Sequence, residues 1–223
     1  MSFSVAIDGP AASGKSTIAK ELANGMGLVH IDTGAMYRAI TYLCLKRGID
    51  CQNIPQVNAL LPEINIELTL DEKVFINGED VTTAIRSSEV SDNVSYIAAI
   101  KEVRLFLVDL QREMTKNLSI VMDGRDIGTY VLPQAEIKIF MIASVEKRAM
   151  RRYLENQKMG RTGNYEEILS NLKKRDYIDS HRDFAPLKPA EDSIILDTSD
   201  LSIPEVVTAC KKIISNKLGK EIV

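Results

Sequence analysis

Short apolar runs alternate with longer amphipathic segments along this chain. The runs that read as buried strands lie at residues 4–7, 28–32, 119–123, 137–142 and 193–197. Short, mainly apolar runs of this kind are typical of strands in the core of a sheet. Because segments with helical spacing separate them, the pattern predicts an α/β fold in which helices flank a doubly wound, five-stranded parallel sheet.

One part of the chain has a different pattern. Apolar residues occupy every second position from residue 64 to residue 70, and residues 73–77 can form the second strand of a hairpin. Alternation of period two is typical of antiparallel strands. We therefore expect a small antiparallel β insert at about 64–85. Around it, the pattern predicts a helix over 33–47, a loop or short helix over 50–63, and a helical segment over 91–117.

The first predicted strand leads directly into a glycine-rich loop. The residues after Asp8 fit the pattern G-x-x-x-x-G-K-[ST] of a phosphate-binding P-loop, and a helix begins near Ile18. Glycines let successive backbone N–H groups turn inward around a phosphate chain, lysine adds a charge at the β- and γ-phosphates, and the serine hydroxyl can ligate Mg²⁺. We therefore expect a nucleoside triphosphate site formed by Gly9, Pro10, Ala11, Ala12, Ser13, Gly14, Lys15, Ser16 and Thr17.

Aspartates stand at or just past the ends of four predicted strands. They are Asp8, Asp32, Asp123 and Asp197. In open parallel sheets, ligands bind at the carboxyl ends of the strands. These carboxylates therefore mark the edge at which we expect the site.

Composition narrows the possible classes of protein. The 223 residues, 45% hydrophobic and 26% charged, are ordinary for one soluble globular domain over 1–223, and a net charge of −3 gives no reason to expect nucleic-acid binding. Three cysteines and two histidines form no metal-ligand or disulfide pattern. We see no apolar run long enough to span a membrane and no signal segment, so we expect a cytoplasmic protein.

Residues 146–182 form a basic segment. Ten Lys and Arg stand against six Asp and Glu, which gives a local charge of +4. A solvated helix face explains part of it, and we assign Lys147, Lys173 and Lys174 to that face. Guanidinium groups also suit phosphate oxygens, so the arginines beside two glycines can form a lid at about 148–165. The lid candidates are Arg148, Arg151, Arg152 and Arg161, with Gly160 and Gly163 as hinge positions.

Three further motifs make the assignment more specific. They are D-T-G-A-M-Y-R at 32–38, D-G-R-D-I-G-T at 123–129, and R-D-x-x-D-S-x-R at 175–182. Together with the P-loop they make the chain resemble the bacterial cytidylate kinase family of nucleoside monophosphate kinases, over nearly its whole length. The resemblance implies a single kinase domain with a monophosphate-binding region at about 38–115, and transfer of a phosphoryl group from ATP, with Mg²⁺, to CMP or dCMP.

The resemblance also implies roles for individual residues. Residues 9–17 and Arg151 would bind ATP, Ser16 would ligate Mg²⁺, and Asp123 would help to organise the ion. Lys15, Asp123, Arg125 and Arg182 would be the catalytic set. The acceptor CMP would contact Thr33, Tyr37, Arg38, Ser95, Arg104, Arg125, Asp126, Arg175, Asp179 and Arg182. Within that set the resemblance implies base contacts from Ser95, Arg104 and Asp126, and sugar contacts from Arg175 and Asp179.

Structural explanations remain open for several of these side chains. Ser95 can be a helix-surface serine, and Arg104 can extend its guanidinium into water. Tyr37 can serve packing alone. The remaining alternatives are an ion pair between Arg125 and Asp126 at a strand end, and a surface pair between Asp179 and Arg182.

Three other functions also remain open. One is a P-loop kinase for a different small acceptor, such as UMP, AMP or shikimate. A GTPase-like switch would need an N-K-x-D guanine-binding motif, which we do not find. The third is a nucleotide-binding protein without turnover. For the favoured enzyme we expect ATP and CMP or dCMP as its partners, no nucleic acid or membrane, and a monomer.

Overall fold

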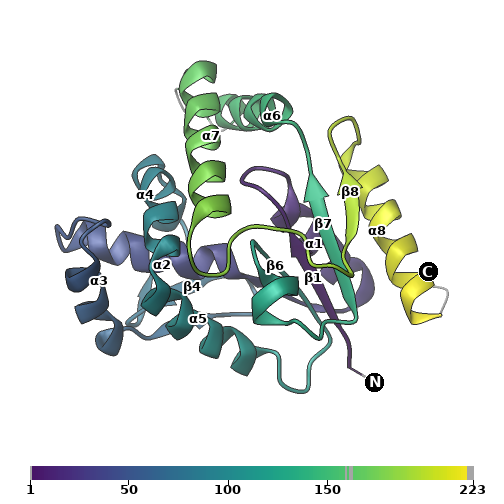
Figure 1. Ribbon diagram of the computed structural model, residues 1–223, viewed down its shortest axis with the longest axis horizontal. Helices are drawn as coiled ribbons and strands as arrows, with labels where there is room; N and C mark the ends of the chain where they lie inside the picture. The colour runs from purple at the N-terminus through teal and green to yellow at the C-terminus, as the bar shows by residue number, and fades with distance from the viewer. Residues whose placement is uncertain (1, 159, 161–162, 220–223) are drawn as a thin grey trace.

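A parallel sheet forms the centre of the molecule (Figure 1). The computed structural model describes residues 2–158, 160 and 163–219. The strand order is β2-β6-β1-β7-β8, and every neighbouring pair is parallel, which confirms the predicted five-stranded sheet. Its strands are β1 (Ser4–Asp8), β2 (Val29–Asp32), β6 (Ile120–Gly124), β7 (Ile137–Ile142) and β8 (Ile194–Asp197).

Helices cover both faces of this sheet. Side chains alternate along a strand, so Val5 and Ile7 of β1 lie on one face and Ala6 lies on the other. The first face packs on α1 (Lys15–Met26) and α8 (Ile203–Leu218). The second packs on α5 (Lys101–Met114) and a π-helical turn, η3 (Ile127–Val131). The three central strands β1, β6 and β7 are almost entirely buried, whereas the edge strands β2 and β8 are partly exposed.

A second core lies around the β insert. Its antiparallel sheet has the order β3-β4-β5, so the expected hairpin is present with a third, short strand that was not predicted. Residues 50–63 contain a short helix, one of the two structures the pattern allowed. The elements of this region are α2 (Thr33–Lys46), α3 (Ile54–Leu60), η1 (Leu61–Glu63), β3 (Ile66–Leu68), β4 (Val74–Ile76), β5 (Glu79–Asp80), η2 (Ala84–Arg86) and α4 (Ser88–Ala99).

The helical segment expected over 91–117 is in fact two helices. Helix α4 begins early because the Ser87 side chain caps it, accepting from the Val90 N–H, and it ends at Ile100, whose backbone is extended (φ −73°, ψ 119°). Helix α5 begins immediately after that break. The break leaves the Ala98 carbonyl at a helix end, where Arg104 donates to it at 3.0 Å. Side chains from two differently oriented helices, α4 and α5, can therefore reach one site.

Two long helices stand beyond the carboxyl ends of the strands. In Figure 1, α6 (Val145–Lys158) and α7 (Tyr165–His181) lie at the top, past the arrowhead of β7. A small apolar cluster of Ala11, Ala149 and Leu172 joins them to the loop after β1. Across the described residues, none of the helices combines the length and the apolar character needed to cross a membrane.

Candidate functional site

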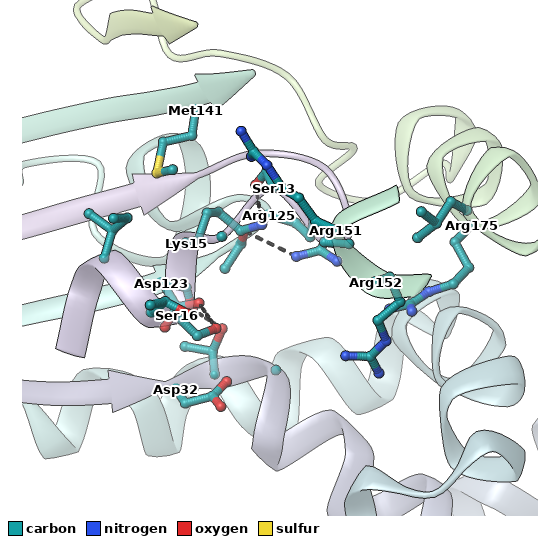
Figure 2. Close-up of a pocket in the computed structure, with 18 of the residues that line it drawn as sticks. Ser13, Lys15, Ser16, Asp32, Asp123, Arg125, Met141, Arg151, Arg152 and Arg175 are labelled. Carbon is teal, nitrogen blue, oxygen red and sulfur yellow. Dashed lines mark hydrogen bonds between the residues drawn. The ribbon is translucent and has the colours of Figure 1, made fainter. Parts of the chain in front are cut away.

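One cavity of about 950 Å³ opens at the carboxyl ends of the parallel strands. Its walls come from the loop after β1, the first turns of α2, helix α4, the end of β6, helices α6 and α7, and the segment after β8. Figure 2 shows Ser16, Asp32 and Asp123 on one side of it and the guanidinium groups of Arg152 and Arg175 on the other. Elements far apart in the sequence therefore meet at the expected edge of the sheet. Of the four strand-end aspartates, Asp32 and Asp123 line the cavity, whereas Asp8 and Asp197 do not.

The glycine-rich loop has the backbone geometry of an anion site. Gly9 has a φ of +151°, and a Cβ atom there would lie 2.2 Å from the Met141 carbonyl oxygen. Gly14, with a φ of +91°, precedes the first turn of α1. Only glycine suits both positions. The first turn of α1 lines the cavity and has no side-chain cap, so its backbone N–H groups favour a phosphate there.

Lys15 lies buried inside this loop. Its Nζ donates to the Pro10 carbonyl oxygen at 2.7 Å and to Ser13 Oγ at 3.1 Å. Burial and the neighbouring charge of Arg125 hold the pKa of Lys15 well below its usual value. A cation in this environment gains from an added anionic ligand. The loop therefore holds the ammonium group where a phosphate chain would stabilise it.

Asp123 links the P-loop to β2. Ser16 Oγ donates to Asp123 Oδ2 at 2.7 Å, and His30 Nε2 lies 2.8 Å from Asp123 Oδ1. Hydroxyl and carboxylate oxygens are the ligands that Mg²⁺ prefers. The structure, over its described residues, contains no group of three or more His, Cys, Asp or Glu side chains that could hold a metal alone. These residues fit Mg²⁺ only as one side of a site that phosphate oxygens and water would complete.

Three ion pairs form the opposite end of the cavity. Arg104 forms a buried pair with Asp126, and Arg182 Nη2 lies 3.5 Å from the other carboxylate oxygen of Asp126. Arg125 Nε donates to Asp179 Oδ2 at 2.8 Å. The alternatives of an Arg125–Asp126 pair, an Asp179–Arg182 surface pair and a solvent-exposed Arg104 head are therefore wrong. Each charge instead pairs across the fold, because the chain turns sharply after β6.

Other features of this end point to a polar ligand. Burial raises the pKa of Asp179, but Arg125, Arg175 and Arg182 outweigh that effect and hold it below its ordinary value. The Nε atoms of Arg104 and Arg175 are buried, with no hydrogen-bond partner in the part of the chain that the structure describes. Buried donors without partners are unfavourable. Ser95 is also buried and lines the cavity, so the helix-surface alternative is wrong.

Arginines between the two ends form a positive cluster. Arg38 donates to the Ile85 carbonyl oxygen at 3.1 Å and to Ser91 Oγ at 2.9 Å. Burial, together with the charges of Arg175 and Arg86, lowers the pKa of Arg38 to about 9. Burial and Arg125 lower the pKa of Arg175 to about 10. Like charges held this close indicate a site for an anion.

Two further residues from the motifs lie beside this cluster. Thr33 Oγ1 donates to the Asp123 carbonyl oxygen at 2.7 Å. The ring of Tyr37 is buried under the Arg104 guanidinium, whose central carbon is 5.4 Å from the ring centroid. Both side chains line the cavity and also have clear packing roles.

The lid candidates divide into three kinds. Arg148 is buried against protein groups and does not line the cavity, so its expected place among phosphate-facing arginines is wrong. Arg151 and Arg152 do line it; Arg151 donates to the carbonyl oxygens of Thr198 and Ser199, and Arg152 pairs with Glu155. Arg161, together with residues 159 and 162 of the expected lid, lies outside the described residues.

Comparison with known proteins identifies the family of this chain. Residues 5–216 match the family model for cytidylate kinase. A cytidylate kinase of Anoxybacillus flavithermus is 51% identical over 219 residues, which cover 97% of each chain. A cytidylate kinase of Streptococcus agalactiae is 50% identical over 211 residues, 93% of each. The chain belongs to the cytidylate kinase family. A gluconokinase structure from Sinorhizobium meliloti, 12% identical with a TM-score of 0.52 over 96% of this chain and 92% of that one, shares the fold.

Two residues of this cytidylate kinase site were not predicted from the sequence. Arg86, from η2, lines the cavity and pairs with Asp32 at 2.7 Å, while Asp32 also caps α2 by accepting from the Ala35 N–H. His30 was counted only among residues that form no metal-ligand pattern, yet it contacts Asp123. This contact depends on the parallel register of β2 and β6, which sets Asp32 beside Asp123 and which no sequence pattern shows. Nothing local indicated Arg86.

Asp8 supports the turn after β6, at the end of the cavity that carries Arg125 and Asp126. Its two carboxylate oxygens accept the N–H groups of Ile127 and Gly128, each at 2.8 Å. These bonds fix the turn that carries Arg125 and Asp126. Burial raises the pKa of Asp8 from 3.8 to about 7, against the opposing effect of the two backbone donors.

This pKa predicts a pH dependence of stability. Between the unfolded and folded pKa values the folded state binds one more proton, so its stability falls as pH rises and levels off above about pH 7. Asp8→Asn removes this titration. In urea unfolding, we expect the free energy of unfolding of the wild type minus that of Asp8→Asn to fall by about 1.4 kcal/mol per unit between about pH 5 and about pH 7. A difference that does not change with pH would contradict the assignment.

Proposed function

We propose that this chain transfers the γ-phosphoryl group of ATP to CMP or dCMP. The observation that carries the proposal is a single cavity with a P-loop at one end and the buried Arg104–Asp126–Arg182 cluster at the other. Family membership supports the same activity. The site needs no side chain that acts as a nucleophile, because an oxygen of the acceptor phosphate attacks in line.

The donor nucleotide is assigned to the P-loop. Residues 9–17 would surround its phosphates, and residues 12–17 of this loop line the cavity. Lys15 would lie beside the group that is transferred, and Arg151 near the donor. Mg²⁺ would be held by the Ser16 hydroxyl and near the Asp123 carboxylate, with phosphate oxygens and water as its other ligands. When bound, this ion would neutralise charge on the phosphates. The residues of the chain bind the donor, orient it and neutralise the charge of its phosphates.

The acceptor is assigned to the other end. Cytosine has an exocyclic amine as donor and N3 and O2 as acceptors. A protein site that recognises this base therefore needs a carboxylate together with N–H or O–H donors. Asp126, Arg104 and Ser95 supply that mixture. The remaining acceptor contacts would be made by Thr33, Tyr37, Arg38 and Arg125 at the phosphate and by Arg175 and Asp179 at the sugar, with Arg182 between the two phosphate sites.

Catalysis in this proposal comes from positioning and charge. Arg125, Arg182 and Lys15 would neutralise the charge that spreads over the transferring group. Water must be excluded, since it would otherwise accept the phosphoryl group. We propose that residues 38–115 form the monophosphate-binding region and that the α6–α7 segment, including 148–165, closes over the donor.

A panel of acceptors tests this proposal. With ATP as donor, we expect CMP and dCMP to be phosphorylated, and UMP and AMP to show kcat/KM values lower by roughly 10²-fold or more. Uracil presents an oxygen where cytosine has its amine, so it would face the Asp126 carboxylate unfavourably. A coupled assay of ADP release measures kcat/KM for each acceptor. Equal use of UMP or AMP would favour another small-acceptor kinase, and ATP binding without any transfer would favour a non-catalytic protein.

A further inference from the structure

Two side chains outside the cavity hold one residue of the P-loop. Arg148 of α6 donates to the Ala11 carbonyl oxygen at 2.9 Å, and Asp176 of α7 accepts from the Ala11 N–H at 3.3 Å. The two side chains also pair with each other, with Arg148 Nη2 2.7 Å from Asp176 Oδ2. Both polar backbone groups of Ala11 are therefore bound to one ion pair.

A further hydrogen bond holds Arg148 of this ion pair in place. Arg148 Nε donates to the Ala143 carbonyl oxygen at 2.9 Å, next to the start of α6. The Arg148 side chain is 6% exposed and that of Asp176 is 22% exposed. Charge-assisted hydrogen bonds shielded from water are strong and directional. Arg148 therefore uses donors on three of its nitrogens within the protein and is not available to a phosphate.

Packing and backbone strain make this contact important. Ala11 packs with Ala149 of α6 and Leu172 of α7 in a separate apolar cluster. The next residue, Ala12, has a φ of +58°, which a residue with a Cβ adopts only when its surroundings hold it there. Ala12 lines the cavity, whereas Ala11 does not. The ion pair thus binds the residue directly before the strained, cavity-lining one.

We propose that Arg148 and Asp176 are positioning residues that set the P-loop conformation for the donor nucleotide and couple it to α6 and α7. The proposal rests on the assignment of the donor to the P-loop. Without the pair, the Ala11 peptide is free to turn, and the backbone donors that surround the phosphates lose their arrangement. Affinity for the donor should then fall. The acceptor end should keep its affinity, because among the described residues its side chains form no hydrogen bond or ion pair with Arg148 or Asp176, and only the charge of Asp176 acts on Arg125 and Arg175.

The test uses Arg148→Met, Asp176→Asn and the double variant in the full chain. Calorimetry of ATP binding without acceptor should show a Kd raised about 10- to 100-fold, with KM for CMP within about twofold. Because the two side chains act as one unit, the Kd of the double variant for ATP should be no higher than that of the single variant that binds ATP more weakly. Matched controls are Lys147→Met and Asp200→Asn, which break an exposed pair at 2.7 Å that also begins on α6.

Hydrogen exchange supplies a readout besides affinity. The backbone amides of residues 9 and 11–17 should exchange faster in the two single variants than in the controls, while exchange elsewhere in the chain stays unchanged. If Arg148→Met does not fold, Asp176→Asn, which keeps the shape of α7, decides the matter. An unchanged Kd for ATP, or equal weakening of ATP and CMP, would overturn the proposal. Failure of the wild type to phosphorylate CMP would overturn the proposed function alone, because ATP binding is measured separately.

Discussion

Lys15→Ala is expected to lower kcat roughly 10²- to 10³-fold, the typical effect of deleting one electrostatic donor from a transferring group. Lys15 lies buried in the P-loop, with its ammonium group bound to Pro10 and Ser13 and with a depressed pKa. A bound triphosphate would replace these contacts with stronger ones. The loss should therefore appear mainly in turnover, with a smaller change in the affinity for ATP.

Stability should move in the opposite direction from activity in this variant. The depressed pKa of Lys15 means that its charged form is less favourable in the folded protein than in the unfolded chain. Removing this side chain should therefore leave the free energy of unfolding unchanged or raise it. The matched control is Lys20→Ala, on the same helix, where the lysine is half exposed and pairs with Glu72. Coupled assays and urea unfolding measure both quantities. Near-normal turnover of Lys15→Ala would remove Lys15 from the proposed mechanism.

Much of the fold was predictable because its signals are local. Strands in the middle of a parallel sheet are mostly apolar, so the five runs identified the sheet without knowledge of its strand order. The P-loop was equally clear, since Gly9 and Gly14 adopt conformations that other residues avoid. The β insert followed from its alternation. In each case the physical requirement acts within a few residues of sequence.

The side-chain partners could not be predicted, because they depend on where distant segments meet. Arg125 and Asp126 are neighbours in sequence and were considered as a pair, yet each binds a residue from another helix. The break at Ile100 was hidden because the apolar spacing continues through it. Arg148 fits the composition of a phosphate-binding cluster, and only the approach of α7 shows that its partner is Asp176.

Asp126→Asn is the variant that should separate the two substrates most clearly. Asparagine keeps the shape of the side chain but leaves the buried Arg104 and Arg182 without a compensating charge and offers the cytosine amine a weaker acceptor. We expect KM for CMP to rise on the order of 10²-fold, because removing one partner of a buried charge pair has a large effect. KM for ATP should change by about twofold or less, since the P-loop lies at the other end of the cavity.

The same variant should also relax the choice of base. An amide can donate to the uracil oxygen that a carboxylate repels, so the ratio of kcat/KM for CMP to that for UMP should fall in Asp126→Asn. Asp109→Asn is the control, because Asp109 is exposed on α5, the helix that carries Arg104. Steady-state kinetics with both acceptors at saturating ATP measure the ratio. If KM for ATP rises as much as KM for CMP, or the ratio stays constant, Asp126 does not read the base, and the acceptor assignment must move away from the Arg104–Asp126–Arg182 cluster.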